Sequence, residues 1–121
     1  MNNLKDQLAK IVRGEVDDSP EVKEFYSHDA SMFELVPQVV LFPKDAEDIK
    51  KVVSFVAGGK EKNPNLSVTV RSGGTCMSGG SVSESIVLDV QKYMHEIGVV
   101  TPTAASAQPG DEFDKLFAGT P

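Results

Sequence analysis

Apolar residues recur at helical spacing in two long parts of the chain. In residues 3–13 the apolar positions are Leu4, Leu8, Ile11 and Val12. After Asp45, which can cap the start of a helix, they are Ala46, Ile49, Val52, Val53 and Val56. The spacing predicts an amphipathic helix in each part, the first closed by Gly14 and the second by Gly58 and Gly59.

Capping residues predict a shorter helix between these two. Ser19 can accept a hydrogen bond as the N-cap, Pro20 suits the first helical position, and Glu21 suits the first turn. The residues expected on its buried side are Val22, Phe25 and Tyr26.

Three short apolar runs, residues 38–42, 66–70 and 86–90, predict strands. The order strand, helix, strand predicts a right-handed crossover that places the second strand beside the first and parallel to it. In the second run, alternate residues should share one face; they are Leu66, Val68 and Val70. The pattern therefore predicts an α/β (α+β) fold with a small parallel βαβ sheet flanked by helices.

The chain is rich in glycine and serine between the second and third predicted strands. Residues 71–81 read Arg-Ser-Gly-Gly-Thr-Cys-Met-Ser-Gly-Gly-Ser and hold four of the ten glycines. Glycine permits a positive φ and close approach of a ligand to the main chain, so consecutive amides can form a nest for an anion. We expect a phosphate or pyrophosphate here. The candidate cofactor-binding residues are Arg71, Ser72, Gly73, Gly74, Thr75, Cys76, Met77, Ser78, Gly79 and Gly80.

Two common phosphate loops do not fit this stretch. A Walker A loop ends in Gly-Lys-Ser/Thr, whereas Gly80 is followed by Ser81 and Val82. A dinucleotide-binding Gly-x-Gly-x-x-Gly opens a helix, whereas this loop leads through residues 82–85 into a strand. A different nucleotide geometry is expected.

The loop resembles the one in the FAD-binding domain of the vanillyl-alcohol oxidase / p-cresol methylhydroxylase (PCMH-type) flavoprotein family. FAD-linked oxidases and dehydrogenases of glycolate and D-lactate carry an Arg-Gly-Gly-Gly-Thr-Ser-x-x-Gly-like loop that holds the FAD pyrophosphate through its backbone. Residues 71–79 follow this pattern, with Ser72 in place of a glycine and Cys76 in place of a serine. Residues 26–31, 36–43, 86–90 and 108–110 also match, and the resemblance covers roughly residues 24–117.

The resemblance implies an N-terminal helical segment (1–34), a first FAD-binding subdomain (35–97) and the start of a second one (98–121). It implies the FAD-binding part of an oxidoreductase that oxidises a small 2-hydroxy acid by hydride transfer to FAD. The rest of the FAD domain and a substrate-binding cap domain would complete the enzyme, so the chain resembles an amino-terminal fragment and carries no catalytic residue of its own. The alternative is a non-catalytic module that binds a nucleotide or another anion.

Two loop residues have further implications. Some relatives attach FAD covalently through a histidine at the position of Thr75, so the resemblance implies FAD held without a covalent bond. Cys76 is either a small replacement for the family's serine or a reactive thiol whose thiolate is stabilised by nearby amides. Arg71 is expected to support the loop backbone or to balance the pyrophosphate charge.

Other candidate chemistry has simpler interpretations. Residues 27–29 are Ser-His-Asp, but adjacent residues cannot form a catalytic relay, and Asp29 or Ser31 is expected to turn the chain through local side-chain hydrogen bonds. His95 and Glu96 have no second cluster to join as metal ligands. The methionines expected to fill the core are Met32, Met77 and Met94.

The last part of the chain predicts a strand, a turn and a short helix. Residues 99–107 are expected to contribute a strand to a second sheet, and residues 108–110 to form a turn. Asp111 would then cap a short helix that packs Phe113, Leu116 and Phe117 inward.

Composition restricts the partners. The 121 residues, 40% of them apolar and 25% charged, are typical of one globular domain. The net charge of -6 argues against nucleic acid as a partner, because nucleic-acid binding needs clustered Lys and Arg. No run is long and apolar enough for a membrane span or signal peptide. A single cysteine cannot form an internal disulfide, so the chain is expected in the cytoplasm.

Overall fold

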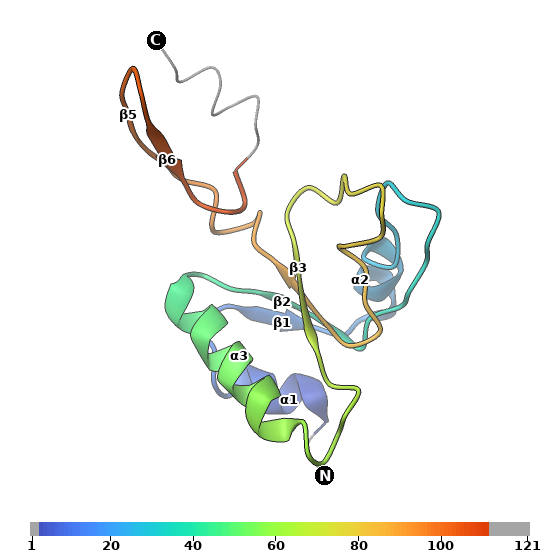
Figure 1. The fold of residues 1–121 in the computed structure, drawn as a ribbon. Helices are drawn as coiled ribbons and strands as arrows, with labels where there is room; N and C mark the ends of the chain where they lie inside the picture. Colours follow the sequence, from blue (N-terminus) through green and yellow to red (C-terminus); the bar gives the residue numbers. More distant parts are fainter. Residues whose placement is uncertain (1–2, 112–121) are drawn as a thin grey trace.

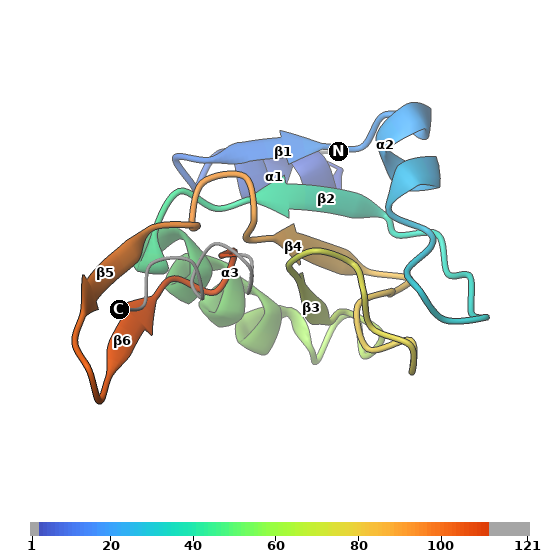
Figure 2. The same cartoon turned by 90° about the horizontal axis from the view of Figure 1, so that it is seen from above.

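The computed structural model describes residues 3–111. Its centre is a sheet with helices on both faces (Figure 1). The strands of this sheet are β1 (Glu15–Asp17), β2 (Val39–Phe42), β3 (Val68–Arg71) and β4 (Ile86–Asp89). They lie in the order β1-β2-β4-β3, with β1 antiparallel to β2 and the other pairs parallel (Figure 2). The predicted α/β fold class is therefore confirmed.

The sheet order corrects one prediction. β2 and β3 are not neighbours, because β4 lies between them and pairs Ile86 with Val39 on one side and Val68 on the other. The predicted parallel direction is right and the predicted adjacency is wrong. All of β4 is buried, whereas Val70 in β3 is 54% exposed and does not share the burial of Leu66. The uniformly apolar strand thus takes the central position and the alternating one takes the edge.

The sequence pattern does not predict β1. This strand has three residues and one strongly apolar side chain, Val16, too short a run to give a periodic signal. It forms because the chain after the first helix runs antiparallel along β2, with Val16 opposite Leu41. The result is a mixed sheet rather than a purely parallel one.

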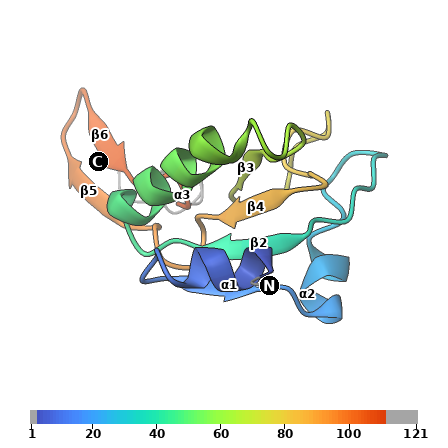
Figure 3. The same ribbon diagram turned by 90° about the horizontal axis from the view of Figure 1, so that it is seen from below.

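Two helices, α1 (Leu4–Ala9) and α3 (Ala46–Gly59), cover the same face of the sheet (Figure 3). The buried core between these helices and the sheet consists of Leu8, Val12, Val39, Leu41, Val52, Val56, Leu66, Ile86 and Leu88. Burial of this apolar surface is the main force that holds the two layers together.

The predicted helix boundaries are partly right. α3 starts after Asp45, whose side chain accepts from the Asp48 amide, as predicted. Val53 is 50% exposed, which is wrong for the predicted buried stripe, because each helical residue turns by about 100° and Val52 already faces the core. α1 is shorter than the predicted residues 3–13, although Val12 is still buried.

The third helix, α2 (Pro20–Phe25), packs on the opposite face of the sheet. Its predicted N-terminus is confirmed, because the Ser19 side chain accepts from the Val22 amide and Pro20 is the first helical residue. Tyr26 is buried against this face, but Phe25 is 68% exposed, so the prediction of a buried Phe25 is wrong. This face holds few apolar side chains, and the Tyr26 ring already covers them.

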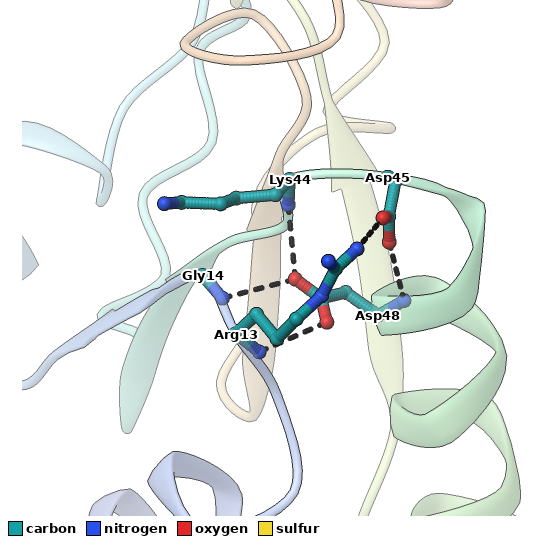
Figure 4. Close-up of polar contacts among 5 residues, drawn as sticks. All are labelled: Arg13, Gly14, Lys44, Asp45 and Asp48. Atoms are coloured by element: carbon teal, nitrogen blue, oxygen red, sulfur yellow. Dashed lines mark hydrogen bonds and ion pairs between the residues drawn. The ribbon is translucent and has the colours of Figure 1, made fainter.

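A buried carboxylate joins α1, β1 and α3 (Figure 4). Asp48 accepts hydrogen bonds from the amides of Arg13 (3.0 Å), Gly14 (2.9 Å) and Lys44 (3.0 Å). The Arg13 guanidinium also pairs with Asp45. Burial alone would raise the pKa of the Asp48 carboxyl, but the three amide donors outweigh burial and hold this pKa below its ordinary value. Gly14 is required here, because an added Cβ would lie 2.0 Å from the Phe42 carbonyl oxygen.

A separate two-stranded antiparallel sheet follows, formed by β5 (Ile97–Val100) and β6 (Ala105–Ala107). It projects away from the main sheet (Figure 1). The predicted second sheet is thus present, with two strands where one was expected. The helix predicted after Asp111, with Phe113, Leu116 and Phe117, lies outside the described residues. Among residues 3–111, no helix is long and apolar enough to cross a membrane.

Candidate functional site

The glycine-rich loop begins at the carboxyl end of β3 and returns the chain to β4 (Figure 1). Ligands of α/β sheets generally bind at this edge. The loop borders a hollow of about 380 Å³. Its lining residues are Val70, Ser72, Gly73, Gly74, Thr75, Cys76, Gly80 and Ser81. Six of the ten predicted cofactor residues therefore share one concave surface with two of their neighbours, Val70 and Ser81.

The loop amides are available to a ligand. Within residues 3–111, the amides of residues 72–77 donate no hydrogen bond to a protein acceptor. Gly74 has a φ of 68° and Gly79 a φ of 80°, values that only glycine adopts at low cost. Uncommitted donors beside a hollow are what an anion requires, so the residues present fit a phosphate group.

Arg71 supports the loop from beneath. Its side chain is 7% exposed. Nη1 donates to the carbonyl oxygens of His28 (2.5 Å) and Tyr26 (3.5 Å), and the guanidinium lies 4.9 Å from the centre of the Tyr26 ring. A Cβ added to Gly74 would lie 2.5 Å from Nη2. Of the two roles predicted for Arg71, these contacts favour support of the backbone over direct charge balance.

A buried hydrogen bond continues this support into the sheet. The Tyr26 hydroxyl donates to the carboxylate of Asp89, the last residue of β4 and the register partner of Arg71. Burial and this bond raise the pKa of Tyr26. Sequence reasoning missed Asp89. A carboxylate that ends an otherwise apolar strand is the signal that identifies it.

The segment that follows α2 forms a second wall of the loop. Asp29 accepts from the Ser31 amide (2.8 Å), which confirms its predicted turn, and from the Ser81 hydroxyl (3.1 Å). The hydrogen bond from the Ser31 hydroxyl is the largest cause of a lowered pKa at Asp29. Phe33 packs against the same end of the loop, because a Cβ on Gly79 would lie 2.7 Å from the Phe33 ring. The sequence gives no signal for Phe33.

Cys76 is half-buried and its sulfur faces the backbone of the loop. The Gly80 amide lies 3.3 Å from Sγ. Hydrogen bonds from the Ser78 and Gly80 amides lower the pKa of the thiol, while burial and the charge of Asp29 oppose them. The sulfur therefore acts as an acceptor that shapes the turn.

The methionines only partly follow the prediction. Met94 is buried at 6% exposure and fills the core as expected, but Met32 (92%) and Met77 (81%) are exposed. Their prediction as core filling is wrong, because both lie in loops that extend away from the sheet. Met77 is therefore a large apolar side chain of the candidate loop that projects into solvent.

The side chains of Ser27, His28 and Asp29 do not form a relay. The buried Ser27 hydroxyl donates to the Glu24 carbonyl (2.6 Å), and His28 lies near Glu24 and Glu34 instead. The structural interpretation of this tripeptide is confirmed. His95 and Glu96 are exposed, and they belong to no group of potential metal ligands within the described part of the chain.

Comparison with known sequences gives a consistent result. The sequence model of a family described as "FAD binding domain" matches residues 37–120. A D-2-hydroxyglutarate dehydrogenase from Pseudomonas putida is 29% identical over 85 residues, which cover 70% of this chain and 8% of the relative. The enzyme of the same name from Escherichia coli is 30% identical over 76 residues, 63% of this chain and 7% of the relative. The matched residues thus span less than a tenth of the length of these relatives.

Solved structures share the fold. 6-Hydroxy-D-nicotine oxidase from Arthrobacter nicotinovorans superposes with a TM-score of 0.69 at 23% identity, over 87% of this chain and 23% of that one. An alkyldihydroxyacetonephosphate synthase superposes with a TM-score of 0.61 at 14% identity, over 84% of this chain and 21% of that one. At these identities the likeness concerns the fold alone.

Proposed function

This chain belongs to the FAD binding domain family, and we propose that its loop of residues 71–81 binds the pyrophosphate of FAD. The observation that carries the proposal is that the amides of residues 72–77, beside a hollow of about 380 Å³, donate to no acceptor in the described part of the chain. Amides that need no rearrangement lose little entropy when they bind an anion. The hydroxyls of Ser72 and Thr75, which line the same hollow, add further donors.

The role of each loop residue follows from its contacts. Gly73 and Gly74 leave the main chain open to the ligand, and Arg71 holds Gly74 in its positive-φ conformation from the protein side. Asp29 and Ser81 fix the far end of the loop. Thr75 occupies the position of a covalent histidine in some relatives, so we propose that this segment holds FAD without a covalent bond.

In a complete protein we propose the oxidation of a small 2-hydroxy acid. When bound, FAD supplies the hydride acceptor for that chemistry. The support is the likeness to enzymes named D-2-hydroxyglutarate dehydrogenase, which makes D-2-hydroxyglutarate the first substrate to test. This chain would position the cofactor. The groups that bind substrate and remove its proton are proposed to lie in a cap domain outside these residues.

We propose that more protein packs beside the loop. β3 pairs only with β4 within the described sheet, and the exposed Val70 lies on the wall of the hollow. An unpaired strand edge with an apolar side chain is a natural surface for further strands of the same domain. A cytoplasmic location stays a prediction that is supported by the single cysteine.

Substitutions at two separate glycines, Gly73 in the loop and Gly58 in α3, test whether the loop binds FAD. A Cβ on Gly73 meets only the Thr75 methyl group at 3.7 Å, and a Cβ on Gly58 in α3 meets nothing within 4 Å. The protein should therefore tolerate valine at either position. Gly73→Val narrows the hollow, whereas Gly58→Val is a matched control. We expect isothermal titration with FAD to show at least about tenfold weaker binding for Gly73→Val and unchanged binding for Gly58→Val.

The same titration distinguishes the proposed FAD-binding function from the alternative, a non-catalytic module that binds a nucleotide or another anion. Loop amides alone recognise any diphosphate, so an ADP affinity equal to that for FAD would favour the module. Tighter binding of FAD, with a flavin absorption band in the purified chain, favours the proposed function. Equal FAD affinity of Gly73→Val and the unchanged chain would contradict the assignment of the loop, provided that both give the same circular dichroism spectrum.

A further inference from the structure

Three potential metal ligands meet at the end of α2, away from the residues that line the hollow. They are Glu24 in the helix, His28 in the turn that follows it, and Glu34 in the returning segment. One ligand atom from each lies within 4.8 Å of the other two. The Nε2 atom of His28 is 3.6 Å from a carboxylate oxygen of each glutamate.

The backbone that carries these side chains is held in place without any ion. His28 and Glu34 face one another across an antiparallel bridge. The buried Ser27 hydroxyl donates to the Glu24 carbonyl at 2.6 Å, and the Arg71 guanidinium donates to the His28 carbonyl at 2.5 Å. Three exposed side chains on a fixed backbone bind an ion with less loss of entropy than three on a mobile loop.

The spacing fits a transition metal. Bonds of about 2.0–2.2 Å to nitrogen and oxygen in a tetrahedral site place neighbouring ligand atoms about 3.4 Å apart. The two distances of 3.6 Å need only a small side-chain movement to reach this value. Imidazole with two carboxylates is a ligand set that Zn²⁺ and its neighbours accept, whereas Ca²⁺ and Mg²⁺ prefer oxygen ligands only.

We propose that Glu24, His28 and Glu34 form a surface site for a divalent transition-metal ion such as Zn²⁺. The charges of the three side chains favour a bound divalent cation over an ion pair between His28 and one glutamate. One imidazolium can neutralise one carboxylate, and the second glutamate would remain unbalanced, whereas a divalent cation neutralises both. The side chains are 51% to 73% exposed, so water completes the coordination.

An ion at this site would connect the two ends of residues 28–34, the segment that packs against the glycine-rich loop. His28 and Glu34 bracket Asp29, which binds Ser81, and Phe33, which lies against Gly79. Metal binding would therefore restrain residues 28–34 and, through them, one side of the glycine-rich loop. This proposal does not depend on the identity of the ligand in the hollow.

Isothermal titration of the 121-residue chain with Zn²⁺ and, separately, with Mg²⁺ tests the site. We expect one saturable Zn²⁺ site and no comparable Mg²⁺ binding. The variants His28→Asn and Glu34→Gln should each weaken Zn²⁺ binding by at least about tenfold. The controls His95→Asn and Cys76→Ser remove the other strong Zn²⁺ ligands in the sequence and should leave binding unchanged.

Amide hydrogen exchange tests the same site without any substitution, and therefore does not depend on how well a variant folds. In the unaltered chain, Zn²⁺ should slow amide hydrogen exchange in residues 28–35 relative to the distant hairpin 97–107. Absence of saturable Zn²⁺ binding would overturn the proposal, as would equal binding by His28→Asn. Loss of binding in His95→Asn or Cys76→Ser would also overturn it, because it would place the ion elsewhere.

Discussion

The guanidinium group of Arg71 occupies the space that a side chain on Gly74 would need. A Cβ at Gly74 would lie 2.5 Å from Nη2 and 2.9 Å from Cζ of that group. The two residues therefore depend on each other, because the arginine supports a backbone turn that only glycine can adopt without a clash. This pairing links a strand end, a buried cation and the candidate anion site.

Gly74→Ala should destabilise the chain even without a ligand. Alanine at a φ of 68° costs about 1–2 kcal/mol in the left-handed region, and the contact with Arg71 adds to it. Urea denaturation followed by circular dichroism measures the change. Gly73→Ala is the matched control, because its Cβ meets only an ordinary contact at 3.7 Å. Equal stability of the two variants would contradict the role given to Arg71.

Arg71→Lys separates support of the backbone from balance of charge. Lysine keeps the positive charge but cannot reproduce the planar contacts with Tyr26 and His28. We expect a loss of about 1–3 kcal/mol in the free energy of unfolding without ligand. Arg13→Lys, at a residue 64% exposed in its ion pair with Asp45, should change it little. An unaltered stability of Arg71→Lys would favour charge balance instead.

Tyr26→Phe should lower the stability of the chain, because it removes the buried hydrogen bond to Asp89. The substitution keeps the ring and leaves a buried carboxylate oxygen without its donor, which costs about 1–3 kcal/mol. Tyr93→Phe is the control, since its hydroxyl contacts Glu15 at the exposed surface. Thermal unfolding should show a clearly larger decrease in Tm for Tyr26→Phe. Similar decreases would show that burial of the pair contributes nothing.

Asp48 should make stability depend on pH. Its pKa is lower in the folded chain than the ordinary value, so the unfolded chain binds its proton first as the pH falls. The stabilisation is complete above the unfolded pKa of about 3.9 and disappears as the pH drops through the folded pKa.

Asp48→Asn replaces one acceptor oxygen by a donor and should cost about 2–3 kcal/mol at pH 7. Urea denaturation at pH 7 and at pH 3 should show the difference between Asp48→Asn and the unaltered chain becoming smaller at the lower pH. A constant difference would contradict the role of the charge. Asp6→Asn, in the exposed first turn of α1, is the control.

Flavin bound through this segment should be released on denaturation. Thr75 offers no nucleophilic nitrogen for a covalent link, so precipitation of flavin-loaded protein with acid should leave the flavin in the supernatant. Absorption of the supernatant and pellet measures the partition. Flavin retained in a pellet that contains this chain alone would contradict the proposed non-covalent binding.

The sequence predicted the parts of the fold that depend on local patterns. The cap at Ser19, the start of α3 after Asp45 and the apolar strands each follow from neighbouring residues. The position of β4 between β2 and β3 does not, because strand order is decided by which strand can be buried on both edges. A right-handed crossover is compatible with either order.

In the candidate site, too, the local features were predictable from the sequence and the contacts between distant residues were not. Gly74 and Gly79 have the positive φ values that the glycine-rich pattern predicts. The pattern says nothing about Asp29, Phe33 or Asp89, whose contacts with the loop and its support join residues far apart in sequence. Such contacts arise from the packing of α2 and the segment after it, which no single stretch of the chain specifies.

The central strand of the sheet is also the last of its four strands to be synthesised. β2 and β3 each hydrogen-bond to β4 and not to each other, so neither can form its parallel ladder while residues 86–89 are still inside the ribosome. A nascent chain that ends before this point leaves β3 without a partner and one edge of β2 unpaired, a state that favours aggregation and chaperone binding. Completion of the parallel part of the sheet therefore waits for a late segment of the chain.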